Sequence, residues 1–283
     1  QKGIAYMEEK NYPDAIEIFE EILKKSTNYP NVADKMSEAK SAYKQQLMSQ
    51  ADEKINSKDY SGALEILEKG ENYFTDDSTF SSKITEVKNN VKNTALSEAE
   101  SAFSTEGYQK SITIIETAIS FCGENEELTN ALNKYKAYVP VNIVDIDPSE
   151  TSRNNKVEKG ETGVDNTNQT HKKNLYAFHR LYSQDDAYAV YPLMGKYDTL
   201  TFEAYRSNYD TSTDESITIK IFGDNTELQS IVIDKGFNPN QYSIDISGVQ
   251  KLKIVFESYD TNVFKQFDKL PGELANVIVS KTK

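Results

Sequence analysis

The sequence predicts a multidomain α-then-β protein, in which an array of helical repeats precedes an antiparallel β-sandwich. Three observations predict this fold class. A short phrase recurs at a fixed step in the first half, the hydrophobic period changes from 3.6 to 2 residues near Pro140, and no helix-length segment separates the strand-like runs that follow. We therefore expect a helical region over residues 1–138 and a sandwich over residues 139–283.

The repeat appears as "KNYPDAIEIFEEIL", "KDYSGALEILEKG" and "EGYQKSITIIETA", in which Tyr12, Tyr60 and Tyr108 are spaced 48 residues apart. Small residues recur with the same step at 3, 51 and 99 and at 15, 63 and 111, and large apolar residues recur at 7, 55 and 103. Self-similarity at a fixed period is typical of helical repeats that bury their apolar faces against one another. Six or seven helices in antiparallel pairs are expected, including one long helix over 81–103.

The order of a small residue, a large residue, a turn, an aromatic residue and a second small residue resembles the tetratricopeptide repeat. In that family, small residues allow paired helices to pack closely, and the resemblance assigns this role to Ala15 and Ala63. The period of 48 residues exceeds the usual period of about 34, which implies longer helices and connections in this chain.

The second half contains short runs rich in Val, Ile, Tyr and Phe, separated by turn residues. Ile217, Ile219 and Ile221 alternate with Thr218 and Lys220, as in a strand with one buried face. Short connections exclude parallel crossover units and favour an antiparallel jelly roll. The Asn- and Thr-rich segment 151–172 is expected to be a loop. Strands are expected at 140–146, 174–183, 186–193, 197–207, 216–224, 229–234, 242–247, 251–258 and 275–281.

The run "AVYPLMGKYDTLTFEAY", followed by "ITIKIFGDNTELQSIVIDKGFNPNQYSIDISGVQKLKIVFES", resembles the NPCBM family of carbohydrate-binding modules. The resemblance covers residues 142–282 and implies a sandwich that binds carbohydrate without catalysis. Sugar-binding sites often stack a pyranose on Trp, which is absent here, so the stacking role falls to the 18 tyrosines. The matching positions are Tyr191, Leu193, Gly195, Lys196, Tyr197, Gly223, Asp224, Gly236, Pro239, Ile246, Gly248, Val249, Leu252 and Ile254.

The composition is acidic, with 45 Asp and Glu against 32 Lys and Arg and a net charge of −13. The sequence contains no long basic patch, so we expect no nucleic-acid partner, because phosphate binding needs clustered Lys and Arg. No apolar run approaches the roughly 20 residues of a membrane span. The single cysteine, Cys122, excludes an internal disulfide and is expected to be a buried core residue. A first residue of Gln indicates a processed or excised chain. We expect an extracellular or cell-surface location, with the cytoplasm as the alternative.

Catalytic motifs are missing from the sequence. His171 and His179 are the only histidines, and no phosphate-binding Gly-rich loop, dinucleotide fingerprint or nucleophile elbow is present. A hydrolase that uses a pair of carboxylates ranks last, and we expect no enzymatic activity and no cofactor. Acidic residues beside a strand in "IVDIDPSE" suggest a structural calcium site, with Asp145 and Asp147 as ligands.

Two segments combine aromatic and polar side chains of the kind that bind sugars, which need a stacking plane and several hydrogen-bonding groups. The first segment offers Tyr176, His179, Arg180 and Tyr182, and the second offers Arg206, Asn208 and Tyr209. We expect both in loops at one end of the sandwich, where they would bind a glycan or cell-wall polysaccharide. The alternative is an interaction scaffold, in which the groove of the repeats binds a protein or peptide and the sandwich is structural.

Overall fold

The structure is a computed structural model that describes residues 1–25, 29, 31–179, 185–208, 216–258 and 268–282 of the 283-residue chain. Contacts between residues divide the chain into two compact units, residues 1–132 and 133–283. The helices continue to Lys136, and the first strand begins at Val141. In the described part of the chain, every helix is too short or too polar to cross a membrane.

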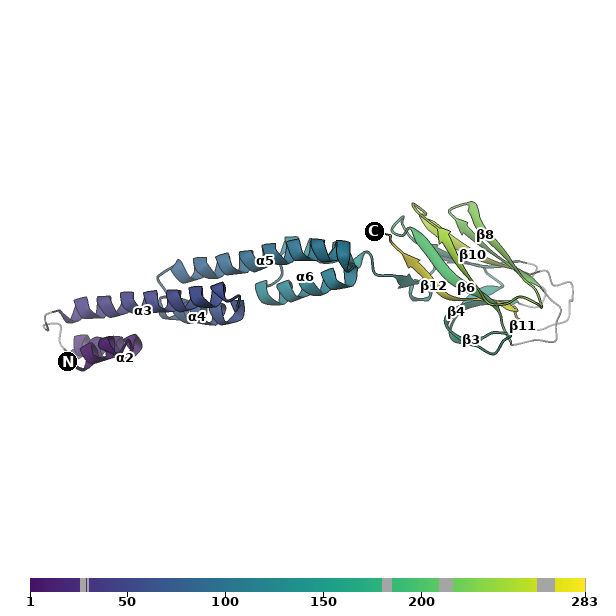
Figure 1. Ribbon diagram of the computed structural model, residues 1–283. Coiled ribbons are helices and arrows are strands. Elements are labelled where there is room, and N and C mark those ends of the chain that lie inside the picture. Colours follow the sequence, from purple (N-terminus) through teal and green to yellow (C-terminus); the bar gives the residue numbers. More distant parts are fainter. Residues whose placement is uncertain (26–28, 30, 180–184, 209–215, 259–267, 283) are drawn as a thin grey trace. The chain divides into compact units, whose positions relative to one another are not determined.

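The first unit is helical, as predicted. Ala, Glu, Lys and Leu dominate its sequence, and these residues lose little side-chain entropy in a helix. The long helix expected over 81–103 lies within α5, so that prediction is confirmed. The described residues form seven helices, α1 (Lys2–Glu8), α2 (Tyr12–Lys25), α3 (Val32–Asn56), α4 (Tyr60–Tyr73), α5 (Thr79–Thr105), α6 (Tyr108–Cys122) and α7 (Glu126–Lys136) (Figure 1).

The 48-residue register agrees with the helices. The three repeated tyrosines are the first residues of α2, α4 and α6. Ala15, Ala63 and Ser111 are fully buried at equivalent positions, where paired helices approach each other. The hydroxyl of Ser111 donates a hydrogen bond to the carbonyl oxygen of Ala99 at 2.7 Å, so this polar side chain is satisfied in its buried position.

The short turns within the helical pairs also repeat. Lys10 and Lys58, which are equivalent in the register, both have left-handed backbone conformations, with φ of 58° and 61°. The third turn uses Gly107 with φ of 96°, a conformation that glycine adopts without steric strain. The Asp59 side chain accepts a hydrogen bond from the Gly62 N–H at 3.0 Å and caps α4.

The second unit is an antiparallel β-sandwich, so the predicted fold class is confirmed. Its described residues form one sheet of seven strands, in the order β11-β4-β12-β6-β9 with β1 paired to β12 and β3 paired to β4, and one of five strands in the order β2-β5-β10-β7-β8. The strands are β1 (Val141–Asn142), β2 (Glu150–Thr151), β3 (Lys156–Val164), β4 (Thr170–His179), β5 (Ala187–Pro192), β6 (Thr199–Arg206), β7 (Ile217–Gly223), β8 (Thr226–Ile233), β9 (Asn240–Asp245), β10 (Lys251–Ser258), β11 (Asp268–Lys269) and β12 (Gly272–Ser280).

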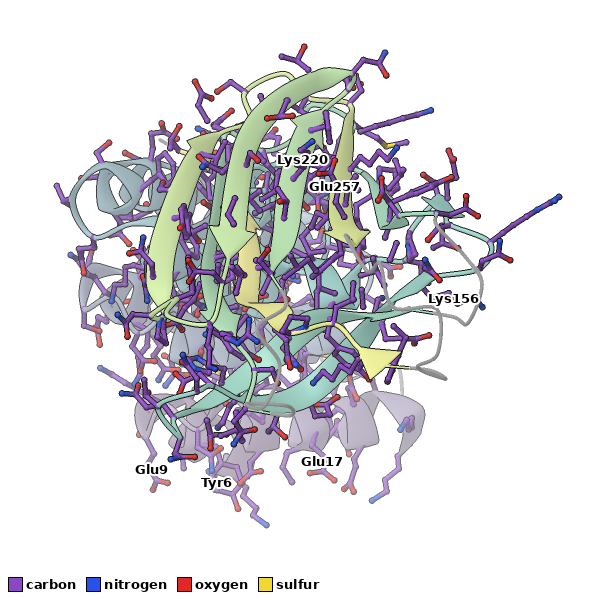
Figure 2. All side chains as sticks on the ribbon, turned by 90° about the vertical axis from the view of Figure 1, so that its right-hand side faces the viewer. Tyr6, Glu9, Glu17, Lys156, Lys220 and Glu257 are labelled. Atoms are coloured by element: carbon purple, nitrogen blue, oxygen red, sulfur yellow. The ribbon has the colours of Figure 1, made fainter. Side chains whose placement is uncertain are left out.

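The core of the sandwich lies between the two sheets and contains the residues that the alternation predicts. Ile217, Ile219 and Ile221 on β7 are buried in the core, as are the alternate residues of β10. The opposite face of this sheet carries charges. Lys220 and Glu257, from neighbouring strands, form an ion pair at 2.5 Å there (Figure 2).

Three local expectations were wrong. The expected strand 140–146 consists of β1 and a 3-10 turn over Ile143–Asp145, because the Asn142 side chain accepts the Val144 N–H and turns the chain. The segment 151–172 is not a loop, since it contains β3 and the start of β4, which pair over most of their length. Cys122 is half-buried, and its thiol donates to the Lys88 carbonyl oxygen at 3.2 Å.

Candidate functional site

The ends of β4 and β6 lie at the same end of the seven-stranded sheet. Both strands pair antiparallel with β12, which lies between them, so they run in the same direction. Leu274 of β12 is opposite both Leu175 of β4 and Ala204 of β6, and Gly272 at the start of β12 is opposite Arg206. The chain therefore leaves β4 and β6 at one edge, beside the start of β12. We call this edge the β4/β6 end.

The structure places four of the seven sugar-binding candidates. The Tyr176 ring is half-buried, with the Lys269 amine 4.4 Å from its centroid. Arg206 is only 2% exposed, so its side chain is not presented to an external ligand. Asn208 is exposed, and its backbone N–H donates to the Val164 carbonyl oxygen at 2.9 Å. The backbone of His179 ends β4. The other three candidates, Arg180, Tyr182 and Tyr209, lie outside the described residues.

The two aspartates suggested as calcium ligands are each paired with a lysine. Asp145 is 2.7 Å from the Lys173 amine, and Asp147 is 3.6 Å from the Lys159 amine. Within the described ranges, no three His, Cys, Asp or Glu side chains are grouped so that they could hold a metal ion.

A hairpin formed by β3 and β4 folds over the outer face of the sheet near the β4/β6 end. Lys173 has a left-handed backbone with φ of 49°, which interrupts β4 where the fold begins. Gly163 lies so close to the hydroxyl of Tyr205 and the carboxylate of Glu273 that a Cβ atom would overlap both. At the tip, Asp165 forms a bridge to Ser207, the residue after β6. Polar side chains that would face solvent on an open sheet are therefore buried.

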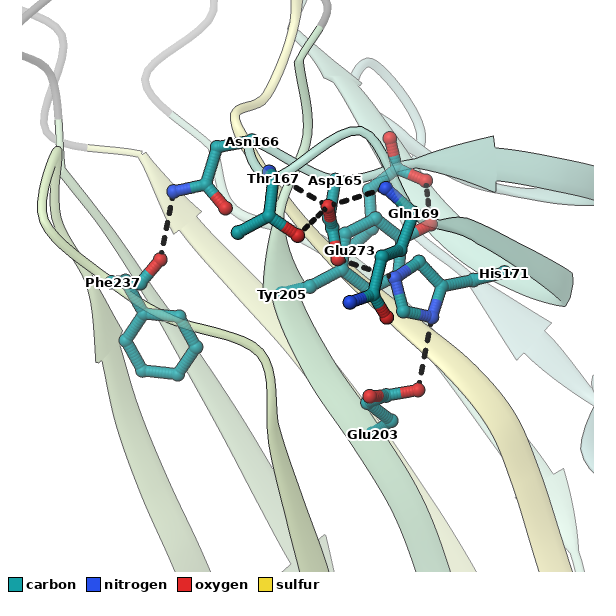
Figure 3. A network of polar contacts seen from close by, with 9 residues as sticks. All are labelled: Asp165, Asn166, Thr167, Gln169, His171, Glu203, Tyr205, Phe237 and Glu273. Atoms are coloured by element: carbon teal, nitrogen blue, oxygen red, sulfur yellow. Dashed lines mark hydrogen bonds and ion pairs between the residues drawn. The ribbon is translucent and has the colours of Figure 1, made fainter.

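Asp165 organises the tip of this hairpin (Figure 3). One carboxylate oxygen accepts the Thr167 N–H and hydroxyl, both at 2.7 Å, and the Gln169 N–H at 3.0 Å. Burial by itself would raise the pKa of Asp165, but the hydrogen bonds from His171, Gln169 and Thr167 outweigh it and lower the pKa to about 2. The carboxylate is therefore ionised at neutral pH and holds the turn.

His171 lies between two carboxylates. Its Nε2 is 2.8 Å from the second oxygen of Asp165, and its Nδ1 is 2.9 Å from Glu203. Both ring nitrogens of His171 therefore lie within hydrogen-bond distance of a carboxylate oxygen. The ring also stacks on Tyr205, with centroids 4.2 Å apart (Figure 3).

Glu273 forms the second half of the network and is fully buried. The Tyr205 hydroxyl donates to it at 2.6 Å, the Asn174 amide donates to the same oxygen, and the Lys269 amine forms an ion pair with the other oxygen. Burial and the charge of Glu273 raise the pKa of Tyr205, so this hydroxyl stays protonated and donates.

Sequence reasoning missed this network. Asp165 and His171 are close in the sequence and flank a turn, which is a weak signal. Glu203 and Glu273 belong to neighbouring strands that are distant in the sequence, and nothing in their local sequence distinguishes them from surface acids. The network fixes the hairpin.

Exposed polar groups surround the β4/β6 end. Asn208 is one of them, and the Asn154 amide donates to the Asp185 carboxylate at 2.9 Å beside the start of β5.

Half of this chain aligns with solved carbohydrate-binding modules. The CBM51-2 and INT domains of Clostridium perfringens ZmpB, solved in complex with GlcNAc, align at 14% identity with a TM-score of 0.40. The alignment covers 50% of this chain and 32% of that one, so this chain spans about a third of that structure. The CBM51 of Clostridium perfringens GH95, solved in complex with methyl-galactose, also aligns at 14% identity and a TM-score of 0.40, over 50% of this chain and 100% of the module.

The tandem CBM51 modules of a family 98 glycoside hydrolase from Streptococcus pneumoniae align at 9% identity with a TM-score of 0.39. That alignment covers 50% of this chain and 47% of the tandem. No protein-family model matches the sequence, and no curated protein matches it either.

Proposed function

We propose that the β-sandwich is a non-catalytic, NPCBM-like module that binds a glycan at the β4/β6 end, and that tetratricopeptide-like helical repeats present it at the cell surface. One observation supports the location above all. The two segments chosen for their side-chain chemistry leave β4 and β6, and these strands end at the same edge of the sheet, on either side of the start of β12, although they are distant in sequence. Their side chains therefore start from a common edge.

The chemistry of this edge suits a sugar. Asn208 and the paired Asn154 and Asp185 offer exposed amides and a carboxylate, which can bond to neighbouring hydroxyl groups. We assign the stacking role to Tyr182 and Tyr209. Arg206 is buried, so in this proposal it supports the edge and does not contact the ligand.

Recognition at one edge of a sandwich buries little area, so binding should be weak. We expect dissociation constants from micromolar to millimolar, or roughly 4 to 8 kcal/mol. Several copies on one surface would then supply avidity.

Titration calorimetry of the full chain with monosaccharides, methyl-galactose and cell-wall fragments tests this proposal. Tyr182→Ala and Tyr209→Ala should weaken binding. Tyr29→Ala is the matched control, because Tyr29 is an exposed tyrosine of the helical unit. If no glycan binds, or if both variants bind as well as the parent, the proposed site is refuted. Immunolabelling of intact cells tests the surface location.

A groove in the helical unit favours a second candidate function, the binding of a peptide. The groove has a volume of about 650 Å³ and lies between α4, α5 and α6. Tyr60 and Phe121, whose ring centroids are 6.4 Å apart, provide an aromatic wall, and Ile114 adds apolar surface. Selection from a peptide library on the full chain tests this function, since Ile114→Glu should abolish capture by the groove. Capture that survives this change would exclude the groove.

A further inference from the structure

Glu273 connects two side chains that can react with each other. The amine of Lys269 lies on one oxygen of its carboxylate, and the side-chain amide of Asn174 lies on the other. Glu273 and Asn174 are fully buried, and the Lys269 side chain is 15% exposed. A primary amine, a carboxamide and a proton acceptor are therefore held together in a space that excludes most water.

The strands bring these three residues onto one face. Lys269 on β11 is opposite Phe178 on β4, and residues directly opposite in an antiparallel pair share a face. Asn174 shares that face with Phe178, because side chains alternate along a strand. Glu273 reaches it from β12, which pairs with the same part of β4. The arrangement thus depends on the pairing of β11 and β12 with β4.

The surroundings exclude most water from the amine, whose side chain is 15% exposed. The Tyr176 ring lies under the Lys269 amine, with 4.4 Å between nitrogen and centroid, and Gly163 of the overlying hairpin packs against Glu273. Buried charges lose hydration, so transfer of a proton from the ammonium to the carboxylate replaces two buried charges with two neutral groups. The neutral amine is the nucleophilic form of lysine.

We propose that Lys269 and Asn174 become joined by an intramolecular isopeptide bond, with Glu273 as the proton carrier. The ammonium first gives a proton to Glu273, and the free amine then attacks Cγ of Asn174. The Nζ–Cγ bond forms and the Cγ–Nδ2 bond breaks. The second proton lost by Nζ passes to Nδ2, which leaves as ammonia. Glu273 keeps the first proton, so the product contains a neutral amide beside a neutral acid.

The contacts of Glu273 match this sequence of steps. One oxygen touches the nucleophile and the other touches the leaving group, as general acid–base catalysis at both atoms requires. The amide oxygen of Asn174 is buried and has no hydrogen-bond partner among the described residues. A donor near this oxygen would stabilise the negative charge that the carbonyl gains during attack, and protonated Glu273 carries an O–H on the carboxyl group that contacts the same amide.

Mass spectrometry of the full chain tests the proposal directly. The intact mass should be lower than the sequence mass by one ammonia. An N-terminal glutamine can also lose ammonia on cyclisation, so the position of the loss must be found in a tryptic digest. We expect one branched peptide that contains both Asn174 and Lys269, with no cleavage after Lys269, because trypsin does not cut at an acylated lysine.

Variants separate the roles of the three residues. Lys269→Arg keeps the positive charge but cannot form the bond, and Glu273→Gln keeps the shape but cannot accept the proton. Both should lack the branched peptide and unfold about 10 °C lower, since a cross-link between distant residues restrains the unfolded chain. Lys172→Arg, at an exposed position of the same hairpin, should retain the branched peptide. Free Asn174 and Lys269 peptides from the parent protein would overturn the proposal, and linkage in Glu273→Gln would overturn the role of Glu273.

Discussion

Replacement of Ala63 by leucine should destabilise the helical unit, because the larger side chain would overpack the interface between α4 and the helices that contact it. Ala63 is fully buried, and so is Ala51 of the partner helix α3. The 48-residue step relates Ala51 to Ala99. Leucine adds three carbon atoms where the alanine methyl group already has no exposed surface. The helices must move apart or the new side chain must adopt a strained rotamer.

The expected loss follows from the burial of this site. Extra carbon atoms in a well-packed interior destabilise by about 1 to 3 kcal/mol. In a unit of 132 residues, each kcal/mol corresponds to roughly 4 °C in Tm, so the helical transition should fall by about 4 to 12 °C. Far-ultraviolet circular dichroism follows this transition, because the helices dominate the signal.

The chain supplies a matched control for this substitution. At the equivalent position of the next repeat, Ser111 is fully buried and its hydroxyl bonds to the Ala99 carbonyl. Ala63→Ser should therefore find a partner at the Ala51 carbonyl and change stability by less than about 1 kcal/mol. An unchanged Tm in Ala63→Leu, or equal losses in both variants, would refute the close approach that the 48-residue register implies.

Three further changes test other parts of the structure. Gly163→Ala should destabilise the sandwich by about 1 to 3 kcal/mol in urea unfolding, because the new Cβ would overlap buried polar atoms. Gly236→Ala is the control and should be nearly neutral, because the nearest atom to its new Cβ would lie 3.7 Å away. The pKa of Asp165 is lowered from 3.8 to about 2, so its contribution to the unfolding free energy is present above pH 3.8 and is lost as the pH falls through about 2. Asp165→Asn should therefore flatten the fall in unfolding free energy between these pH values. The same dependence of unfolding free energy on pH in the variant and the parent would contradict this. Gly70→Ala should lower the Tm of the helical unit despite better helix propensity, because the new Cβ would overlap the buried Phe80 ring, and a raised Tm would show that the ring can move.

The sequence alone determined the features that depend on local periodicity. The three tyrosines at a 48-residue spacing begin equivalent helices, and the alternating isoleucines of β7 lie in the core. Both patterns are strong because burial on one face of a helix or strand selects residues at a fixed period. β3 escaped recognition because its sequence, "KVEKGETGV", contains few apolar residues and two glycines. Its strand conformation comes from pairing with β4, which no local pattern records.

Only the tertiary structure decided what happens at the β4/β6 end. The fold of the hairpin over the outer face of the sheet buried His171 and Glu273, which the sequence presents as ordinary polar residues. It also brought Asn174 and Glu273 into contact although they are 99 residues apart. Charge and polarity belong to a residue type, but exposure and partners depend on strand register and on which segment covers the sheet. For this physical reason, the sequence could indicate which side chains suit a sugar, while the buried Lys269, Glu273 and Asn174 group emerged only from the folded chain.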